Sequence, residues 1–139
     1  MSILAIDFGL SKIGIAGSDE LNIASHPIKS IRNKSDNSHI DEILAIIDDR
    51  KPKLILIGLP YKDDGRLKIQ DYIEDFHDNL KIKTKTKIEF WNENFTSKEA
   101  DEILIKKMNV SRKKRKEYQD MLSACLIIDS YIRSLQSHT

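Results

Sequence analysis

Three acidic residues stand at points in the chain where an isolated charge would be costly. Asp7 follows an apolar run at residues 3–6, Glu93 follows a run at residues 87–91, and Asp120 precedes the apolar part of the last predicted helix. Carboxylates beside buried apolar elements need partners. If the fold brings all three together, they repel one another unless a divalent cation binds between them, and their oxygen atoms suit Mg²⁺ or Mn²⁺. The chemistry that such a site serves best is phosphodiester hydrolysis.

Each of these acids also has a purely structural explanation. Asp7 could bond the turn at Gly9, a glycine that we otherwise expect to leave room for substrate or metal. Glu93 could belong to the loop before the next helix. Asp120 could be a solvated acid in the first turn of its helix, where the helix dipole favours negative charge. Asp19 fits turn chemistry better than catalysis.

The spacing of apolar residues predicts the elements that must position these acids. Strands are expected at residues 3–6, 12–19, 27–31, 54–58 and 87–91, and helices around 40–47, 69–80 and 96–108 and from about 117 to about 135. The first three strands form an antiparallel meander, whereas the last two alternate with helices and are expected to be parallel. The fold class is therefore α/β, a five-stranded mixed sheet flanked by helices, and the order matches the ribonuclease H-like fold.

Composition predicts one domain over residues 1–139. The chain has 139 residues, 40% of them apolar and 32% charged, which is enough to form one core but not two. Its single cysteine excludes an intramolecular disulfide, and no apolar run reaches the roughly 20 residues that span a bilayer. We expect a cytoplasmic protein with no membrane partner.

The charge is distributed unevenly. The 23 basic and 22 acidic residues give a net charge of +1, so a nucleic acid would have to bind a local basic patch. A dense basic segment precedes Asp120 and is either a solvated face or a surface for phosphate contacts; it comprises Lys106, Lys107, Arg112, Lys113, Lys114, Arg115 and Lys116. Because few acids lie near it, we favour a docking surface. The four histidines lack metal-ligand spacing.

Four blocks that cover nearly the whole chain resemble the YqgF (RuvX-like) family of small bacterial proteins with a ribonuclease H fold. The blocks are Asp7-Phe8-Gly9-Leu10-Ser11-Lys12-Ile13-Gly14-Ile15-Ala16, Ile57-Gly58-Leu59-Pro60 with Asp64-Gly65, Trp91-Asn92-Glu93-Asn94-Phe95-Thr96-Ser97 with Glu99-Ala100, and Asp120 with Ser123-Ala124-Cys125-Leu126-Ile127-Ile128 and Ser130-Tyr131. The family is described as Holliday-junction-resolvase-like and as nucleases that mature the 5′ end of pre-16S ribosomal RNA. The resemblance implies that Asp7, Glu93 and Asp120 are its catalytic, metal-binding acids.

The chain departs from the family pattern beside two of these acids. The family usually has Thr-Lys-Arg where this chain has Leu10-Ser11-Lys12, and Asp-Glu-Arg where it has Asn92-Glu93-Asn94. One acid and two basic groups are therefore missing near the predicted site. Lys12 and the residues Arg112, Lys113, Lys114, Arg115 and Lys116 remain as predicted nucleic-acid contacts.

These observations leave several functions open. The leading hypothesis is a nuclease dependent on Mg²⁺ or Mn²⁺ that acts on precursor ribosomal RNA, alone or in a pre-ribosomal particle. Rival hypotheses are a resolvase of branched DNA, which would act as a homodimer rather than a monomer, and a non-catalytic RNA-binding assembly factor. A nucleotide-phosphate binder ranks last, because two-domain closure over a nucleotide needs a longer chain.

Overall fold

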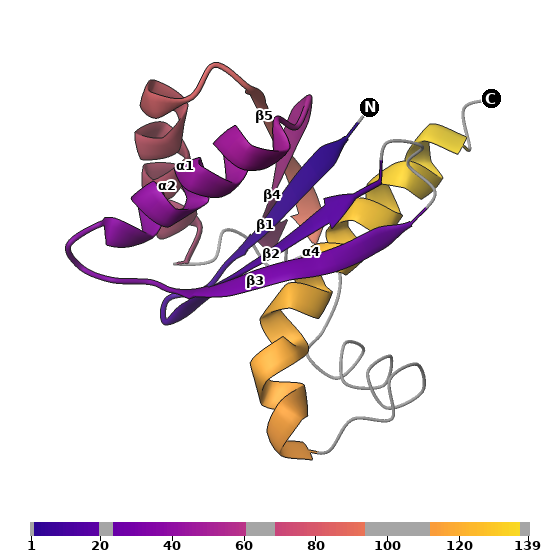
Figure 1. Cartoon of the computed structure of the whole chain (residues 1–139), viewed down its shortest axis with the longest axis horizontal. Coiled ribbons are helices and arrows are strands. Elements are labelled where there is room, and N and C mark those ends of the chain that lie inside the picture. Colours follow the sequence, from indigo (N-terminus) through magenta and orange to yellow (C-terminus); the bar gives the residue numbers. More distant parts are fainter. Residues whose placement is uncertain (1, 20–23, 61–68, 94–111, 137–139) are drawn as a thin grey trace.

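The computed structural model describes residues 2–19, 24–60, 69–93 and 112–136. Its elements, in chain order, are β1 (Ile3–Phe8), β2 (Lys12–Ser18), β3 (Ser25–Arg32), α1 (Ser38–Arg50), β4 (Leu54–Pro60), α2 (Ile69–Lys83), β5 (Lys87–Glu93) and α4 (Arg112–Gln136). The sheet order is β3-β2-β1-β4-β5, with β1 in the centre (Figure 1). β2 runs antiparallel to β1 and β3, whereas β4 runs parallel to β1 and β5. The predicted five-stranded mixed α/β sheet is confirmed.

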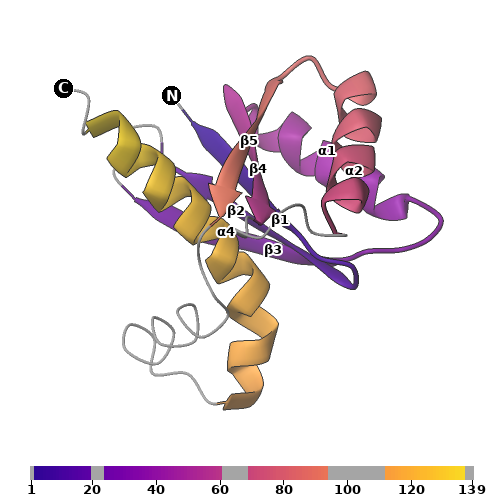
Figure 2. The same cartoon turned by 180° about the vertical axis from the view of Figure 1, so that it is seen from behind.

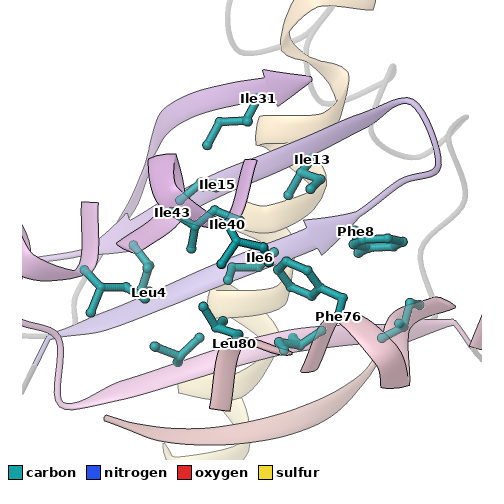
Figure 3. Close-up of a cluster of buried hydrophobic side chains, with 14 residues drawn as sticks. Leu4, Ile6, Phe8, Ile13, Ile15, Ile31, Ile40, Ile43, Phe76 and Leu80 are labelled. Atoms are coloured by element: carbon teal, nitrogen blue, oxygen red, sulfur yellow. The ribbon is translucent and has the colours of Figure 1, made fainter. Parts of the chain in front are cut away.

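Alternation along β1 divides the core into two layers. Leu4, Ile6 and Phe8 face α1 and α2, where they pack with apolar residues of β2 and both helices (Figure 3). Ile3 and Ala5 face the opposite side and pack against α4. The helices therefore cover both faces of the sheet, with α1 and α2 on one side and α4 on the other (Figures 1 and 2).

Two predicted boundaries are wrong in a way that matters for the site. β1 continues through Asp7 to Phe8, because these residues pair with Gly14 and Ile13 of β2, so Asp7 lies inside the strand rather than after it. α4 begins at Arg112, earlier than predicted, since its basic first turns are good helix formers but lack apolar periodicity. The helix predicted at 96–108 lies outside the described residues.

The early start of α4 changes the explanation of Asp120. Counting from Arg112, Asp120 is in the third turn of the helix, not the first. The effect of the helix dipole falls off within the first turn, so a dipole-stabilised terminal acid is the wrong explanation for this residue. No helix in the described part of the chain is long and apolar enough to cross a membrane.

His39 is a buried packing residue, as its lack of metal-ligand spacing predicts. Its side chain is 5% exposed, its Nδ1 accepts a hydrogen bond from the Lys34 N–H at 3.3 Å, and its ring stacks against Phe76. Burial lowers the pKa of His39 from its ordinary value of 6.5. The folded protein therefore takes up a proton at this ring less readily than the unfolded chain does.

We expect His39 to make the fold sensitive to acid. Because its pKa is lower in the folded state, its contribution to stability is complete above pH 6.5 and is lost as the pH falls through the folded-state pKa. Denaturant unfolding at about pH 7.5 and about pH 5 should show a smaller loss of unfolding free energy in His39→Gln than in wild type. An equal loss in the two proteins would contradict this.

Candidate active site

Helix α4 packs tightly against the sheet at Gly14. A Cβ atom on Gly14 would overlap the backbone carbonyl of Asp120 and would lie 2.7 Å from the Met121 nitrogen. Gly14 is also the register partner of Asp7 on β1. The absence of a side chain at this one position therefore brings Asp7 and Asp120 to the same point on the sheet.

Asp7 faces α4 at this point. Successive side chains of a strand point to opposite faces, so Asp7 points to the same face as Ile3 and Ala5. Both of these residues pack in the layer beneath α4. Asp7 is partly buried, and Asp120 is partly buried on the helix above it. The structure thus places two of the three predicted acids on neighbouring elements at the same face of the sheet.

Contacts with the two outermost strands, β3 and β5, hold α4 in this position. Ser25 of β3 donates a hydrogen bond from Oγ to Oδ1 of Asp129 at 2.8 Å. At the other side, Trp91 of β5 donates from Nε1 to Oγ of Ser130 at 3.1 Å and packs edge-on against Tyr131, with ring centroids 5.1 Å apart. These contacts join α4 to strands on both sides of β1, so the backbone of Asp120 has a defined place over Gly14.

The environment of Asp120 favours binding of a cation. Burial raises the pKa of the Asp120 carboxyl above its usual 3.8, whereas the nearby charge of Lys12 lowers it. Lys12 lies two residues before Gly14 on β2, so both positions face α4. Lys12 is exposed, so its ammonium group can lie near α4 while remaining in water. The ionised form of Asp120 therefore carries a desolvation cost that a bound divalent cation would offset.

The influence of Lys12 on Asp120 can be measured directly. In the metal-free protein, a carbon-detected NMR titration of the Asp120 carboxyl should give a pKa above 3.8. Lys12→Gln should raise this pKa further, because it removes the positive charge that favours the carboxylate. An unchanged pKa in the Lys12→Gln protein would show that Lys12 does not act on the site.

Glu93 lies at the same edge of the sheet as Asp7. It is the last residue of β5 and is in register with Pro60, the last residue of β4. β1, β4 and β5 are parallel, so their carboxyl ends share one edge, and strand spacing puts the Cα atoms of Glu93 and Asp7 roughly 12 Å apart. The side chain of Glu93 lies outside the described part of the structure.

Among the described side chains, which do not include that of Glu93, no three histidine, cysteine, aspartate or glutamate residues are arranged as a metal site. The donors that the described part does bring together are Asp7 and Asp120, with Glu93 two strands away at the same edge. Asp7 and Asp120 are both partly buried, and their carboxylate oxygens are of the ligand type that a hard divalent ion binds.

Two glycines lie where a side chain would meet the backbone of another segment. A Cβ atom on Gly9 would overlap the Lys12 carbonyl, so the lack of a side chain there permits the tight β1–β2 turn. Gly14 lets α4 approach the sheet at Asp120, and Ala124, further along the helix, is fully buried against the sheet. An isolated glycine inside an apolar strand signals such a backbone approach, and this signal was available in the sequence.

The predicted basic contacts lie at the start of α4. Arg112, Lys113, Lys114, Arg115 and Lys116 occupy the first turns of this helix, which project beyond the sheet (Figures 1 and 2). The first turn holds no acidic residue. Cations at a helix amino terminus oppose the helix dipole, so this arrangement is unfavourable for the helix in isolation. Side chains 112–118 and the predicted contacts Lys106 and Lys107 lie outside the described part.

Asp7, Asp120 and Glu93 lie toward the carboxyl ends of the parallel strands, and we call this part of the sheet the acidic edge. The fold that carries it is also found in proteins of known structure. The structure is similar to a fowlpox virus resolvase solved with Holliday junction DNA, with a TM-score of 0.64, 15% identity and coverage of 97% of this chain and 99% of that one. It is also similar to Thermus thermophilus RuvC in complex with a Holliday junction substrate, with a TM-score of 0.63, 12% identity and 96% coverage of both chains. These similarities show that the chain has a ribonuclease H-like fold, as the order of its elements predicts.

The chain belongs to the RuvX family, whose model, described as "Holliday junction resolvase", matches residues 1–134. It is 34% identical over 135 residues to a Thermoanaerobacter pseudethanolicus protein named "Putative pre-16S rRNA nuclease", covering 96% of this chain and 97% of that protein. A Clostridium botulinum protein of the same name is 35% identical over 136 residues, covering 97% of this chain and 98% of its own. The resemblance seen in the sequence is confirmed.

Proposed function

We propose that this protein is a nuclease, dependent on Mg²⁺ or Mn²⁺, that processes the 5′ end of pre-16S ribosomal RNA. The observation that carries the proposal is the close packing of α4 on Gly14, which places Asp120 over the register partner of Asp7. Relatives that span nearly the whole chain are named for this activity, which supports the choice of substrate.

Asp7, Glu93 and Asp120 are the residues that would hold the metal. Asp7 and Asp120 come from a central strand and the helix above it, and Glu93 comes from the outermost strand of the sheet, so the proposed site lies at the carboxyl ends of the parallel strands. Divalent ions bound there would activate a water molecule and stabilise the leaving oxygen of a phosphodiester. Rigid strands and an anchored helix hold the acids in place before the substrate binds.

Lys12 and the start of α4 are the residues that would bind the nucleic acid backbone. Lys12 is exposed beside Asp120, and the five basic residues Arg112, Lys113, Lys114, Arg115 and Lys116 project with α4 beyond the sheet. A polyanion would offset the repulsion among these cations and their unfavourable position at the helix start. A substrate backbone would thus run from the projecting end of α4 to the acidic edge.

Resolution of branched DNA is the second candidate function. It is favoured by the description of the family model and by the likeness of the fold to solved junction resolvases. Cutting two strands of a junction symmetrically needs two sites, so this function requires a homodimer.

A cleavage experiment with three substrates tests the proposal. The purified protein is incubated with an RNA that spans the 5′ precursor junction of 16S rRNA, with a four-way DNA junction and with a linear DNA duplex, with Mg²⁺ or Mn²⁺ and with a chelator. Cleavage of the RNA that needs the metal supports the proposal. Cleavage of the DNA junction alone would assign a resolvase, and RNA binding without cleavage of any substrate would assign an assembly factor.

A further inference from the structure

A cavity of about 200 Å³ lies on the opposite face of the sheet from Asp7 and Asp120, at the same edge. Phe8, the residue that follows Asp7, forms part of its lining. Because consecutive residues of a strand face opposite sides, the acidic site and the cavity lie back to back at the end of β1. Figure 3 shows Phe8 at this end of the strand, beside Phe76 of α2.

The lining of the cavity is rich in flat rings. Phe8 and Phe76 lie with ring centroids 5.0 Å apart, and His39 stacks against Phe76 at 6.3 Å. Tyr72 of α2 also lines the cavity, and it is 50% exposed. A ring that is left half in water beside an aromatic cavity offers a stacking surface to a planar ligand.

The polar groups around these rings suit a neutral ligand with hydrogen-bonding edges. Three amides, Asn33, Asn37 and Asn79, line the cavity, and amide groups form paired hydrogen bonds with the edges of nucleobases. The charged residues of the lining are Lys34 and Asp75, which have opposite signs. This balance lacks the excess of positive charge that a phosphate pocket needs.

The walls of the cavity are fixed before any ligand binds. Asn33 donates from its side-chain nitrogen to the Gly9 carbonyl at 2.9 Å, and its backbone N–H donates to the Ser11 carbonyl at 2.9 Å. These bonds tie the segment after β3 to the β1–β2 turn. The hydrogen bond from Lys34 to His39 holds the same segment to the start of α1. The pocket is therefore already ordered in the free protein, so ligand binding need not be accompanied by a further loss of conformational entropy there.

We propose that this cavity binds an unstacked nucleobase of the substrate whose backbone lies at Asp7 and Asp120, with Tyr72 as the stacking ring. The acidic face and the aromatic face of the sheet are both accessible from the end of β1. A nucleic acid strand that crosses this end can therefore place a phosphate on the acidic face and a neighbouring base on the aromatic face. The protein would thus select a single-stranded or splayed nucleotide next to the cleaved bond over a regular duplex. This inference rests on the proposed nuclease function.

Binding without cleavage tests the pocket separately from catalysis. The probe is a single-stranded oligoribonucleotide that carries 2-aminopurine, compared with a duplex of the same sequence, both in the presence of a chelator. Stacking is worth about 1–3 kcal/mol per base, so Tyr72→Ala should weaken single-strand binding about 5- to 160-fold. Binding should quench the 2-aminopurine fluorescence of the single strand in wild type but less in Tyr72→Ala.

Two control variants make the test specific. Tyr72→Phe keeps the ring and should bind the single strand within about twofold of wild type, because stacking does not need the hydroxyl. Phe90→Ala removes a different aromatic side chain that is 38% exposed and lies outside this cavity, and it should have no effect. Duplex affinity should be unchanged in all three variants. Circular dichroism checks that each variant is folded.

Several results would overturn the inference. They are an unchanged single-strand affinity in Tyr72→Ala, an equal loss of duplex affinity, a loss in Phe90→Ala instead, and a wild-type protein that does not prefer the single strand. RNA cleavage with Mg²⁺, measured in the same variants, separates the two proposals. If the RNA is cleaved but Tyr72→Ala binds normally, only the pocket fails, and if Tyr72→Ala loses binding but nothing is cleaved, only the nuclease function fails.

Discussion

Replacing Gly14 by alanine should lower both the stability and the activity of the protein severely. The new Cβ atom would overlap the Asp120 carbonyl and approach the Met121 nitrogen to 2.7 Å, and both are backbone atoms of a helix anchored to β3 and β5. Overpacking of this kind costs about 3 kcal/mol or more when the backbone cannot yield. Chemical denaturation should show this loss of unfolding free energy.

The same substitution should slow cleavage about 100-fold in the protein that remains folded, because α4 must move and carry Asp120 away from Asp7. A misplacement of about 1 Å in a catalytic site has an effect of this size. Gly17→Ala is the matched control on the same strand, since the three atoms nearest to its Cβ atom are side-chain atoms, of Ile28 at 2.9 Å, Arg50 at 3.1 Å and His26 at 3.7 Å. Gly17→Ala should change stability by about 1 kcal/mol or less. Equal behaviour of the two variants would contradict the role of Gly14.

Asp120→Asn should have opposite effects on activity and stability. Cleavage should fall by at least about 100-fold, because the loss of a direct metal ligand should cost no less than the loss of an outer-shell partner. The metal-free variant should be more stable than wild type at neutral pH. Burial raises the pKa of Asp120, so the folded protein binds its proton more tightly than the unfolded chain does, and ionisation above pH 3.8 opposes folding.

Thermal unfolding at several pH values and Mg²⁺ concentrations tests this account of Asp120. The stability advantage of Asp120→Asn should shrink as the pH falls through the raised folded-state pKa of Asp120, and it should be absent below the ordinary carboxyl pKa of 3.8, where the unfolded wild type is also protonated. Added Mg²⁺ should stabilise wild type more than the variant, because only wild type keeps the full set of ligands. A variant that is less stable than wild type at neutral pH would contradict the predicted cost of the buried charge.

The sequence was sufficient to predict the elements of the sheet, since their apolar patterns follow directly from burial. The continuous apolar runs at residues 3–6 and 54–58 correspond to β1 and β4, which are covered on both faces, and the spacing of Ile40, Ile43 and Ile47 corresponds to the buried side of α1. The start of α4 was not predictable in the same way. Its first turns carry charge rather than an apolar face, so periodicity gave no signal there.

The candidate site was predictable in its residue types but not in its geometry. Acids next to apolar runs suggested Asp7, Glu93 and Asp120, yet that pattern cannot tell which of them meet. The contact between α4 and Gly14 is a long-range packing event that depends on the absence of one side chain. The effect of Lys12 on Asp120 depends on the same crossing, because residues far apart in sequence become neighbours only when the helix lies on β2. The roles of all the predicted site residues stay predictions, namely those of Asp7, Glu93, Asp120, Lys12 and the basic residues of α4.

The most direct test of the central claim is Mn²⁺-dependent cleavage of an RNA spanning the 5′ junction of 16S rRNA by wild type, Asp7→Asn and Asp49→Asn. The control residue Asp49 is exposed at the end of α1, on the other face of the sheet, so its substitution removes the same charge away from the site. We predict cleavage by wild type and Asp49→Asn and a loss of at least about 100-fold in Asp7→Asn. Equal cleavage by Asp7→Asn and wild type would contradict the assignment of the acidic edge as the active site.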